Sequence, residues 1–262
     1  MKKTLIALAV AASAAVSGSA MAWTANGTGG SVDLGGTLTP VVKVTPWEVQ
    51  VGATVSDLDA SIVENQSATK ITAKKAIPIL GIRTASSDAF VGEAGISPRI
   101  SYGQALDTNS FKDSTGTITL DMKDAQAQKI GTVTVPMFAG AETSKVSLDK
   151  SFKKLSPTFA SGTDRSFGGG LPRAADQVAA DADSRATALF PDATAHFNKQ
   201  DITVVSSAAN ADDFSDNQYT FSAYYVSGVE QGKEISVQLD NPAAANTSIV
   251  WNASLPITVS YQ

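Results

Sequence analysis

Residues 251–262 end the chain with the stretch "WNASLPITVSYQ", in which apolar and other residues alternate without a break. The odd positions carry Trp, Ala, Leu, Ile, Val and Tyr, and the even positions carry Asn, Ser, Pro, Thr, Ser and Gln. A period of two is the pattern of a β-strand with one buried face. A slip of one residue would turn every apolar side chain to water, so the pattern also fixes the register of the strand.

Similar patterns run through most of the chain. Short runs rich in β-branched residues, separated by turn residues, predict strands at residues 47–51, 69–73, 77–84, 116–124, 129–140, 201–207, 218–226 and 234–240. The run at 77–84 is almost continuously apolar, which predicts burial on both faces. The polar loop "AQAQ" is expected to join 116–124 and 129–140 as neighbours. This spacing predicts an all-β fold, an antiparallel sandwich.

The β pattern fades from about residue 141 to 199. Three glycines precede Pro172, which suits a first helical turn, and Pro191 is expected just beyond the helix end. A stripe at helical spacing comprises Ala175, Val178, Ala182, Ala186 and Leu189. We expect a helix-containing insertion on the surface of the sandwich, with a second compact domain as the alternative.

The first 22 residues have the features of a secretory signal peptide. Lys2 and Lys3 precede a short apolar core, and "AMA" offers small residues for cleavage between Ala22 and Trp23. The apolar run is too short for a spanning helix. We therefore expect an exported protein.

The amino-acid composition excludes several kinds of active site and binding partner. The 262-residue chain has no cysteine, one histidine and a formal net charge of −5. Thiol catalysis and cysteine–metal sites are excluded, and nucleic acid is not an expected partner of an acidic chain. The glycine-rich "SFGGGLP" lacks the Gly-Lys-Ser/Thr ending of a phosphate loop, and the aspartates near 181 and 212 lack EF-hand spacing. We expect no enzyme, no cofactor and no metal.

A second alternating stretch, "SVDLGGTLTP", occupies residues 31–40, close to the mature N-terminus. Val32, Leu34, Gly36 and Leu38 lie in phase, and the preceding residues 23–30 are polar and glycine-rich, as in a free tether. A glycine inside a strand calls for a reason such as close backbone approach. Two hypotheses remain open: the stretch closes its own sandwich, or it adds a strand to the sheet of another subunit.

Several of these stretches together resemble a known family. They are the signal peptide, "WTANGTGGSVDLGGTLTP", "WEVQVG", "ITAKKAIPILGIRT", "MKDAQAQKIGTVTV" and "WNASLPITVSYQ". The chain is similar to the chaperone–usher fimbrial subunits of enterotoxigenic Escherichia coli, and most of all to the K-eighty-eight family of major subunits that are also adhesins. The resemblance covers about half of the mature chain and is weak over residues 141–217. The penultimate Tyr261 and the absence of cysteine fit it.

The resemblance implies an incomplete immunoglobulin-like sandwich completed by donor-strand exchange. Residues 23–40 would be the donor arm, with Val32, Leu34, Gly36 and Leu38 facing inward, and 41–262 the pilin domain. A periplasmic chaperone would bind the groove strand through Leu255, Ile257, Val259, Tyr261 and the carboxylate of Gln262. An outer-membrane usher would then exchange the chaperone's strand for the arm of the next identical subunit. The product would be an extracellular fimbrium on the bacterial surface, exported through the periplasm.

The resemblance also implies binding to host intestinal glycans through an inserted subdomain at about 141–215. Aromatic and polar residues there are the candidates for receptor binding: Phe159, Arg165, Phe167, Arg173, Asp176, Phe190, His196 and Phe197. The alternatives are a non-adhesive minor fimbrial subunit and, from other classes, an outer-membrane β-barrel, a secreted glycosidase or the chaperone itself.

Overall fold

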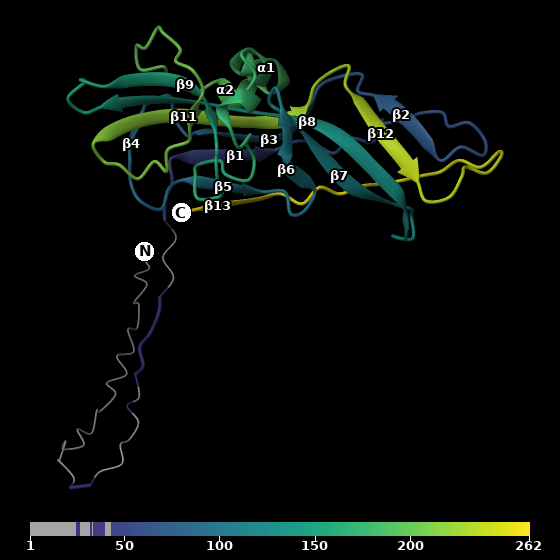
Figure 1. The fold of residues 1–262 in the computed structure, drawn as a ribbon, viewed down its shortest axis with the longest axis horizontal. Helices are drawn as coiled ribbons and strands as arrows, with labels where there is room; N and C mark the ends of the chain where they lie inside the picture. The colour runs from purple at the N-terminus through teal and green to yellow at the C-terminus, as the bar shows by residue number, and fades with distance from the viewer. Residues whose placement is uncertain (1–24, 27–31, 33, 40–42) are drawn as a thin grey trace, which may run out of the picture. The chain divides into compact units, whose positions relative to one another are not determined.

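The structure is a computed structural model that describes residues 25–26, 32, 34–39 and 43–262 (Figure 1). Contacts divide the chain between Val41 and Val42, and every element below lies in the second part. The predicted signal peptide and its cleavage site at Ala22 and Trp23 lie outside the described residues. In the arm, residues 34–39 form no helix or strand.

The main sheet has the strand order β1-β3-β11-β8-β12-β2. These strands are β1 (Trp47–Val51), β3 (Ile77–Thr84), β11 (Tyr219–Val229), β8 (Lys129–Ser147), β12 (Glu234–Leu239) and β2 (Ala68–Thr72). The 19-residue β8 connects the two ends of this sheet. It pairs antiparallel with β11 and β12, and also with β7 (Thr115–Lys123) and β9 (Lys153–Phe159).

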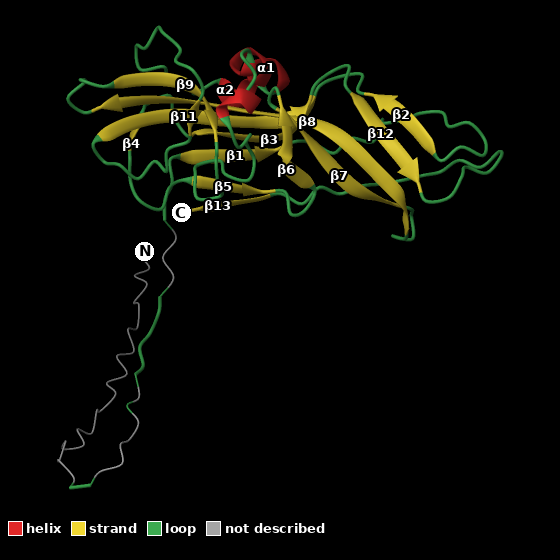
Figure 2. Cartoon of the chain, viewed as in Figure 1, coloured by secondary structure: helices red, strands yellow, loops and turns green. Residues whose placement is uncertain are grey.

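Smaller elements complete the fold (Figure 2). β6 (Leu106–Lys112) pairs with β7, β4 (Phe90–Val91) pairs with β11, and β10 (Ala209–Asn210) runs parallel to β9. β13 (Thr258–Tyr261) and β5 (Pro98–Ser101) form a separate two-stranded sheet. The helical segments are η1 (Ala175–Gln177), α1 (Ala182–Leu189) and α2 (Pro191–Thr194).

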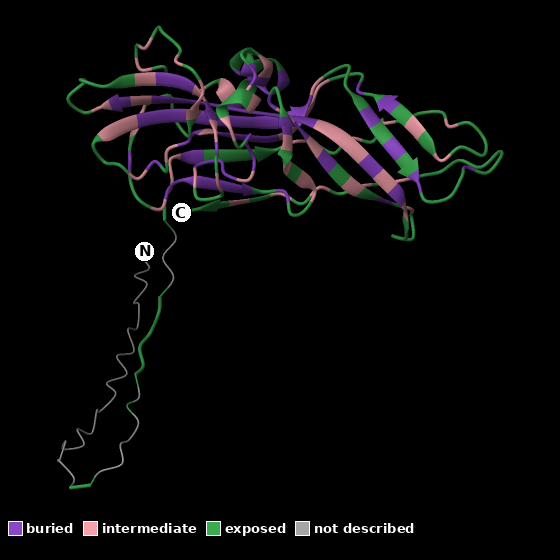
Figure 3. Ribbon diagram, in the orientation of Figure 1, coloured by how far each residue is buried: buried purple, intermediate pink, exposed green. Residues whose placement is uncertain are grey.

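β11 shows how the layers are arranged, because both of its faces are buried (Figure 3). Phe221, Ala223 and Tyr225 contribute to the main core, which also receives side chains from β5 and β13. Tyr224 and Val226 point the other way, into a second core under α1 and α2. Alternation along one strand therefore supplies two cores, one on each face.

A third core lies at the β2–β12 end of the main sheet. It is built from Ile71, Met122, Val133, Ile235, Val237, Leu239 and Ala243. Leu120 and Val135 are only partly buried and pack against both this cluster and the main core. The cover over the sheet is thus incomplete where these two cores meet.

The expected all-β fold with a small helical insertion is confirmed, and the sheets do not close. The apolar run at 77–84 is β3, and the 116–124 and 129–140 runs are antiparallel neighbours. The strand predicted at 201–207 is wrong: in the described structure this segment belongs to no strand, and Val204 and Val205 are exposed. The fading of β structure from residue 141 is also wrong, because β8 continues to Ser147 and β9 follows.

The predicted single helix along the alanine-rich stripe is broken into η1, α1 and α2. Pro172 lies outside these segments. Pro191 lies just beyond the end of α1, as predicted, and also begins α2. The buried members of the stripe, Ala182, Ala186 and Leu189, still face the sheet. The hydrophobic stripe was therefore a better guide to the buried face than to the helix ends.

Candidate functional site

A groove of about 790 Å³ runs beside the C-terminal strand. Residues 250–255 and Ile257 form one wall, and residues 51–56 with Leu58 form the other. The floor consists of apolar side chains from the main sheet: Ile77, Pro78 and Ile79 of β3, Ile118 and Leu120 of β7, Val133 and Val135 of β8, Val229 of β11 and Ile235 of β12. It lies where the main core and the third core meet.

The C-terminal wall keeps the alternation predicted for it. Trp251, Ala253, Leu255, Ile257 and Val259 are half-buried, and the residues between them are exposed. Leu255, Ile257 and Val259 pack on the main core. Three of the predicted groove-strand residues therefore point inward, yet the structure leaves them only half covered.

One edge of this strand is paired. Val259 lies opposite Ile100 of β5, and Gln262 exchanges backbone hydrogen bonds of 3.1 and 3.2 Å with Ser97. Asn252 and Lys123 exchange two more, of 2.8 and 2.9 Å. Between these contacts, residues 253–257 belong to no strand in the described part of the chain. An extended segment with an unpaired edge can accept another strand.

The side chain of Tyr261 is 36% exposed and that of Gln262 is exposed. Burial raises the pKa of the Tyr261 phenol above its ordinary value. The last two predicted groove-strand residues therefore lie at the accessible end of the strand, next to the chain terminus.

The opposite wall was missed by the sequence interpretation. The Gly52 amide donates a 2.9 Å hydrogen bond to the Ile79 carbonyl, and a side chain at Gly52 would collide with the Pro78 carbonyl. Glycine is thus required where the wall approaches the floor. A signal was available, because apolar residues continue at alternate positions from Val51 through Val55.

The floor explains a change of burial along β3. Leu80, Gly81 and Ile82 are buried, whereas Ile77, Pro78 and Ile79 are half-exposed. The apolar run predicts burial on both faces throughout, and the structure leaves its first three residues open to the groove. An apolar floor between two extended walls can bind an extended apolar segment.

The predicted receptor residues are scattered. Phe167 is fully buried in the main core, and Phe190, 6% exposed, lies in the core under the helices. Phe159 ends β9 half-buried, and Phe197 lies edge-on to Tyr224 with ring centroids 5.1 Å apart. These four rings do not form one exposed platform.

The polar members of that group are also separated. Arg165 Nε lies 3.7 Å from Asp164 Oδ2. Arg173 is exposed before η1, and Asp176 is exposed within it. His196 Nδ1 lies 2.7 Å from the Thr84 carbonyl oxygen. In the described part of the chain, no hydrogen bond, ion pair or ring contact joins any two of the eight predicted residues. Their role in receptor binding stays a prediction.

The insertion is anchored in the body of the fold. The Tyr225 hydroxyl donates a 3.0 Å hydrogen bond to the Gly170 carbonyl and lies 2.9 Å from the Tyr102 hydroxyl. Burial raises the pKa of Tyr102 to about 12, so its phenol stays protonated at neutral pH. Phe167 stacks on Tyr225 at 5.8 Å. The glycine-rich loop is therefore part of the main core.

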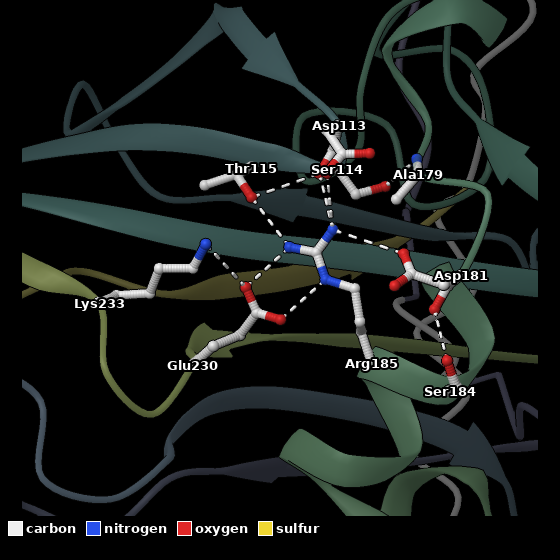
Figure 4. Close-up of polar contacts among 9 residues, drawn as sticks. All are labelled: Asp113, Ser114, Thr115, Ala179, Asp181, Ser184, Arg185, Glu230 and Lys233. Carbon is white, nitrogen blue, oxygen red and sulfur yellow. Dashed lines mark hydrogen bonds and ion pairs between the residues drawn. The ribbon is translucent and has the colours of Figure 1, made fainter.

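Arg185 fixes α1 to the sheet (Figure 4). Its Nε and Nη2 atoms donate hydrogen bonds of 2.8 and 2.7 Å to the two carboxylate oxygens of Glu230. Nη1 donates to the Asp113 carbonyl at 3.0 Å, and Nη2 to the Thr115 hydroxyl at 3.1 Å. The hydrogen bond from Arg185 lowers the pKa of Glu230, and the same bond raises that of Arg185. One side chain thus joins a helix, the β6–β7 turn and the end of β11.

Metal-ligand clusters, membrane-spanning helices and buried carboxyl groups are other features that would bear on function. Among the described residues, no three His, Cys, Asp or Glu side chains gather as a metal site would require. Within the same residues, no helix is both long and apolar enough to cross a membrane. Burial raises the pKa of Glu142 on β8, but this carboxyl is only 3% exposed, under the helical segment.

The chain is similar to known fimbrial proteins along its whole length. A family model described as "Fimbrial, major and minor subunit" matches residues 1–262. "K88 fimbrial protein AC" of Escherichia coli is 31% identical over 285 residues, and "K88 fimbrial protein AD" of the same species is 30% identical over 291 residues. "F41 fimbrial protein", also from Escherichia coli, is 31% identical over 287 residues. Each alignment covers 100% of both chains. The chain therefore belongs to the family of fimbrial major and minor subunits.

Proposed function

We propose that this fimbrial subunit polymerises by donor-strand exchange, with the arm of one subunit filling the groove of the next. The single observation that carries the proposal is the apolar groove along a half-buried C-terminal strand. The open edge of residues 253–257 would supply backbone hydrogen bonds, and the floor would supply apolar contacts.

The arm has the complementary chemistry. Val32, Leu34 and Leu38 are exposed by 79%, 93% and 97%. Burying three such side chains contributes about 5–9 kcal/mol at roughly 1.5–3 kcal/mol each. Ordering the arm costs about 1–2 kcal/mol per residue, so much of this gain is offset. The persistence of the fibre would then depend on slow dissociation as well as on affinity.

Gly36 has a specific place in this proposal. It lies in phase with Leu34 and Leu38, so it would face the groove without a side chain. A glycine there would let the arm approach a raised part of the floor. The proposed inward set is therefore Val32, Leu34, Gly36 and Leu38.

Before assembly, a periplasmic chaperone would cover the same groove. An outer-membrane usher would then exchange the chaperone's strand for the arm of the next subunit. Tyr261 and Gln262 lie at the accessible end of the groove strand, where a chaperone would bind the terminal carboxylate. The final location would be a fimbrium on the bacterial surface.

We also propose an adhesive role, in which the fibre binds host intestinal glycans through the insertion. Exposed side chains at Lys153 of β9, at Asn210 of β10 and along the helical segment support this role. The competing candidate is a non-adhesive minor subunit, since the family description covers major and minor subunits.

The test of assembly compares two faces of the arm. Leu34→Asp should abolish polymerisation while leaving chaperone binding intact, because a charge would enter the apolar groove. Thr37→Asp, on the opposite face, should polymerise normally. Deletion of residues 31–40 should reproduce the Leu34→Asp defect. Fibres of normal length from the deletion variant would refute the proposal.

A further inference from the structure

A second hollow lies over β8, β9 and β10, in which β9 pairs with both β8 and β10. β9 lies at one end of the main sheet (Figure 1). We call this hollow the basic cleft. Its volume is about 200 Å³, and it is lined by Thr143, Lys145, Phe152, Lys154, Ser156, Thr158, Ala209, Asn210 and Asp212. None of the eight residues first predicted to bind receptor is among them.

An aromatic ring stands at the rim of this cleft. Phe152, in the turn between β8 and β9, is 42% exposed. Its ring meets Tyr219 edge to face, with centroids 5.8 Å apart and planes at 86°. The neighbouring ring limits the orientations of Phe152, so its exposed surface is presented in a defined direction. A fixed, partly exposed ring suits contact with the apolar C–H face of a sugar.

Hydroxyl groups lie at the base of the cleft, and the amide of the exposed residue Asn210 lies along its lining. The Thr143 and Thr158 hydroxyls, from adjacent strands, are 3.2 Å apart, and both residues are buried. The Asn210 amide hydrogen-bonds both the backbone and the hydroxyl of Ser161, at 3.1 and 2.9 Å, which fixes its orientation. The carbonyl oxygen and the NH₂ group of the Asn210 side chain each retain capacity for one more hydrogen bond. Groups of these kinds can form hydrogen bonds with the hydroxyls of a sugar ring.

The charge of the cleft is opposite to that of the chain as a whole. The lining of the cleft carries two lysines, Lys145 and Lys154, and one carboxylate, Asp212, in a protein of net charge −5. Lys145 is already partnered, since its Nζ lies 3.3 Å from Asp212 Oδ1 and 4.2 Å from the Tyr219 ring centroid. Lys154 also lines the cleft and has no ion pair among the described residues. The lysines therefore favour an anionic ligand.

We propose that the basic cleft binds one acidic sugar, a pyranose that carries a carboxylate or a sulfate. Its ring would pack on Phe152, its hydroxyls would bond Asn210 and the floor hydroxyls, and its acid group would meet Lys154. The volume suits a single ring. This inference rests on the adhesive part of the proposed function and names the class of ligand for it.

The experiment uses intact fimbriae purified from bacteria that express the whole chain. Binding is measured to immobilised N-acetylneuraminic acid, galactose 3-sulfate and galactose, and adhesion is measured to cultured intestinal cells. Lys154→Ala is paired with Lys153→Ala, a neighbouring exposed lysine that does not line the cleft. Phe152→Ala is paired with Phe152→Tyr, which keeps the ring.

At least one acidic sugar should bind the wild type at least tenfold more tightly than galactose does. Lys154→Ala and Phe152→Ala should each weaken this binding at least tenfold, while Lys153→Ala and Phe152→Tyr retain it. The carboxylate and sulfate probes distinguish the two sources of the charge. Fibre yield and length serve as the folding control.

Two results would overturn the proposal, and they differ in meaning. If wild-type fimbriae adhere to cells and the Lys154→Ala and Phe152→Ala fimbriae adhere equally well, the cleft is not the site but adhesion stands. If wild-type fimbriae bind neither cells nor any of the three sugars, the adhesive function itself fails. Galactose binding as tightly as both acidic sugars would refute the ligand class.

Discussion

Replacing Arg185 by methionine should destabilise the subunit by about 3 kcal/mol. The Arg185 side chain is 14% exposed, and its bidentate partner Glu230 is 21% exposed. Removing one member of a buried ion pair costs roughly 3–5 kcal/mol, and residual exposure places this pair at the low end. The guanidinium also lies 4.6 Å from the Phe138 ring centroid, a cation–π contact worth about 0.5–2 kcal/mol. Methionine retains the apolar contact and removes the charge.

The assay is thermal and urea unfolding at pH 7 of the mature subunit with residues 31–40 moved to the C-terminus behind a short turn linker, because this form is expected to be a monomer. A loss of about 3 kcal/mol in a domain of this size corresponds to a fall in Tm of roughly 6–12 °C. The double variant Arg185→Met with Glu230→Gln should recover part of that loss, because no buried carboxylate is left unpaired.

Two results would contradict this role of Arg185. If Arg185→Met changes the free energy of unfolding by less than about 0.5 kcal/mol, the network does not fasten α1 to the sheet. If the two substitutions add independently, Arg185 and Glu230 do not act as a pair.

Three other outcomes follow from the same structure. Because Arg185 lowers the folded-state pKa of Glu230, this carboxylate contributes stability at neutral pH that is lost as the pH falls through that pKa. The wild type should therefore lose more stability between about pH 5 and 3 than Arg185→Met does. Equal losses in the two proteins would count against this linkage. Tyr261→Ser should lower the periplasmic level of the subunit, measured by immunoblot with the chaperone present, because the end of the groove strand loses an apolar contact; an unchanged level would argue against this anchor. Gly52→Val should displace the groove wall and slow polymerisation in a fibre-assembly assay, whereas Ala53→Val should not; equal rates would show that the wall tolerates a side chain there.

The pattern of apolar residues along the chain was the best predictor of the structure. The pattern over residues 251–262 survives as alternating half-buried and exposed positions, and the 77–84 run is a strand with the same ends. The terminal stretch turns one face to a core, whereas β3 is buried on both faces from Leu80 to Ile82, so in each segment the local pattern and the tertiary packing agree. The hydrophobic face of the groove strand could therefore be predicted, although its unpaired edge could not.

Other strands could not be predicted from the sequence, because a strand buried on both faces need not show an alternating pattern. The second half of β8, "GAETSKVS", mixes small and polar residues without a period, because hydrogen bonds to β9 and β11 hold it in the sheet. Residues 201–207 behave in the opposite way: they are rich in β-branched residues but form no strand, and the Ser206 amide donates one 2.7 Å hydrogen bond to the Leu155 carbonyl of β9. Propensity was overridden by tertiary context in both cases.

The receptor candidates show a different difficulty. Aromatic content in the insertion suggested a platform, but Phe167 packs against Trp47, with ring centroids 5.8 Å apart, and fills the core. The exposed ring of Phe152 lies in the turn between β8 and β9. The sequence did not predict β9 or the second half of β8, so it could not place this ring beside a cleft. Residue type alone could not separate core phenylalanines from surface ones.

The most direct test of the central claim is gel filtration of the mature protein alone, beside a version in which residues 31–40 are moved to the C-terminus behind a short turn linker. We predict that the native arrangement polymerises or aggregates and that the rearranged protein is a stable monomer, because its groove is filled by its own arm. If both versions elute as equally stable monomers, the arm does not belong to a neighbour's sheet, and donor-strand exchange is contradicted.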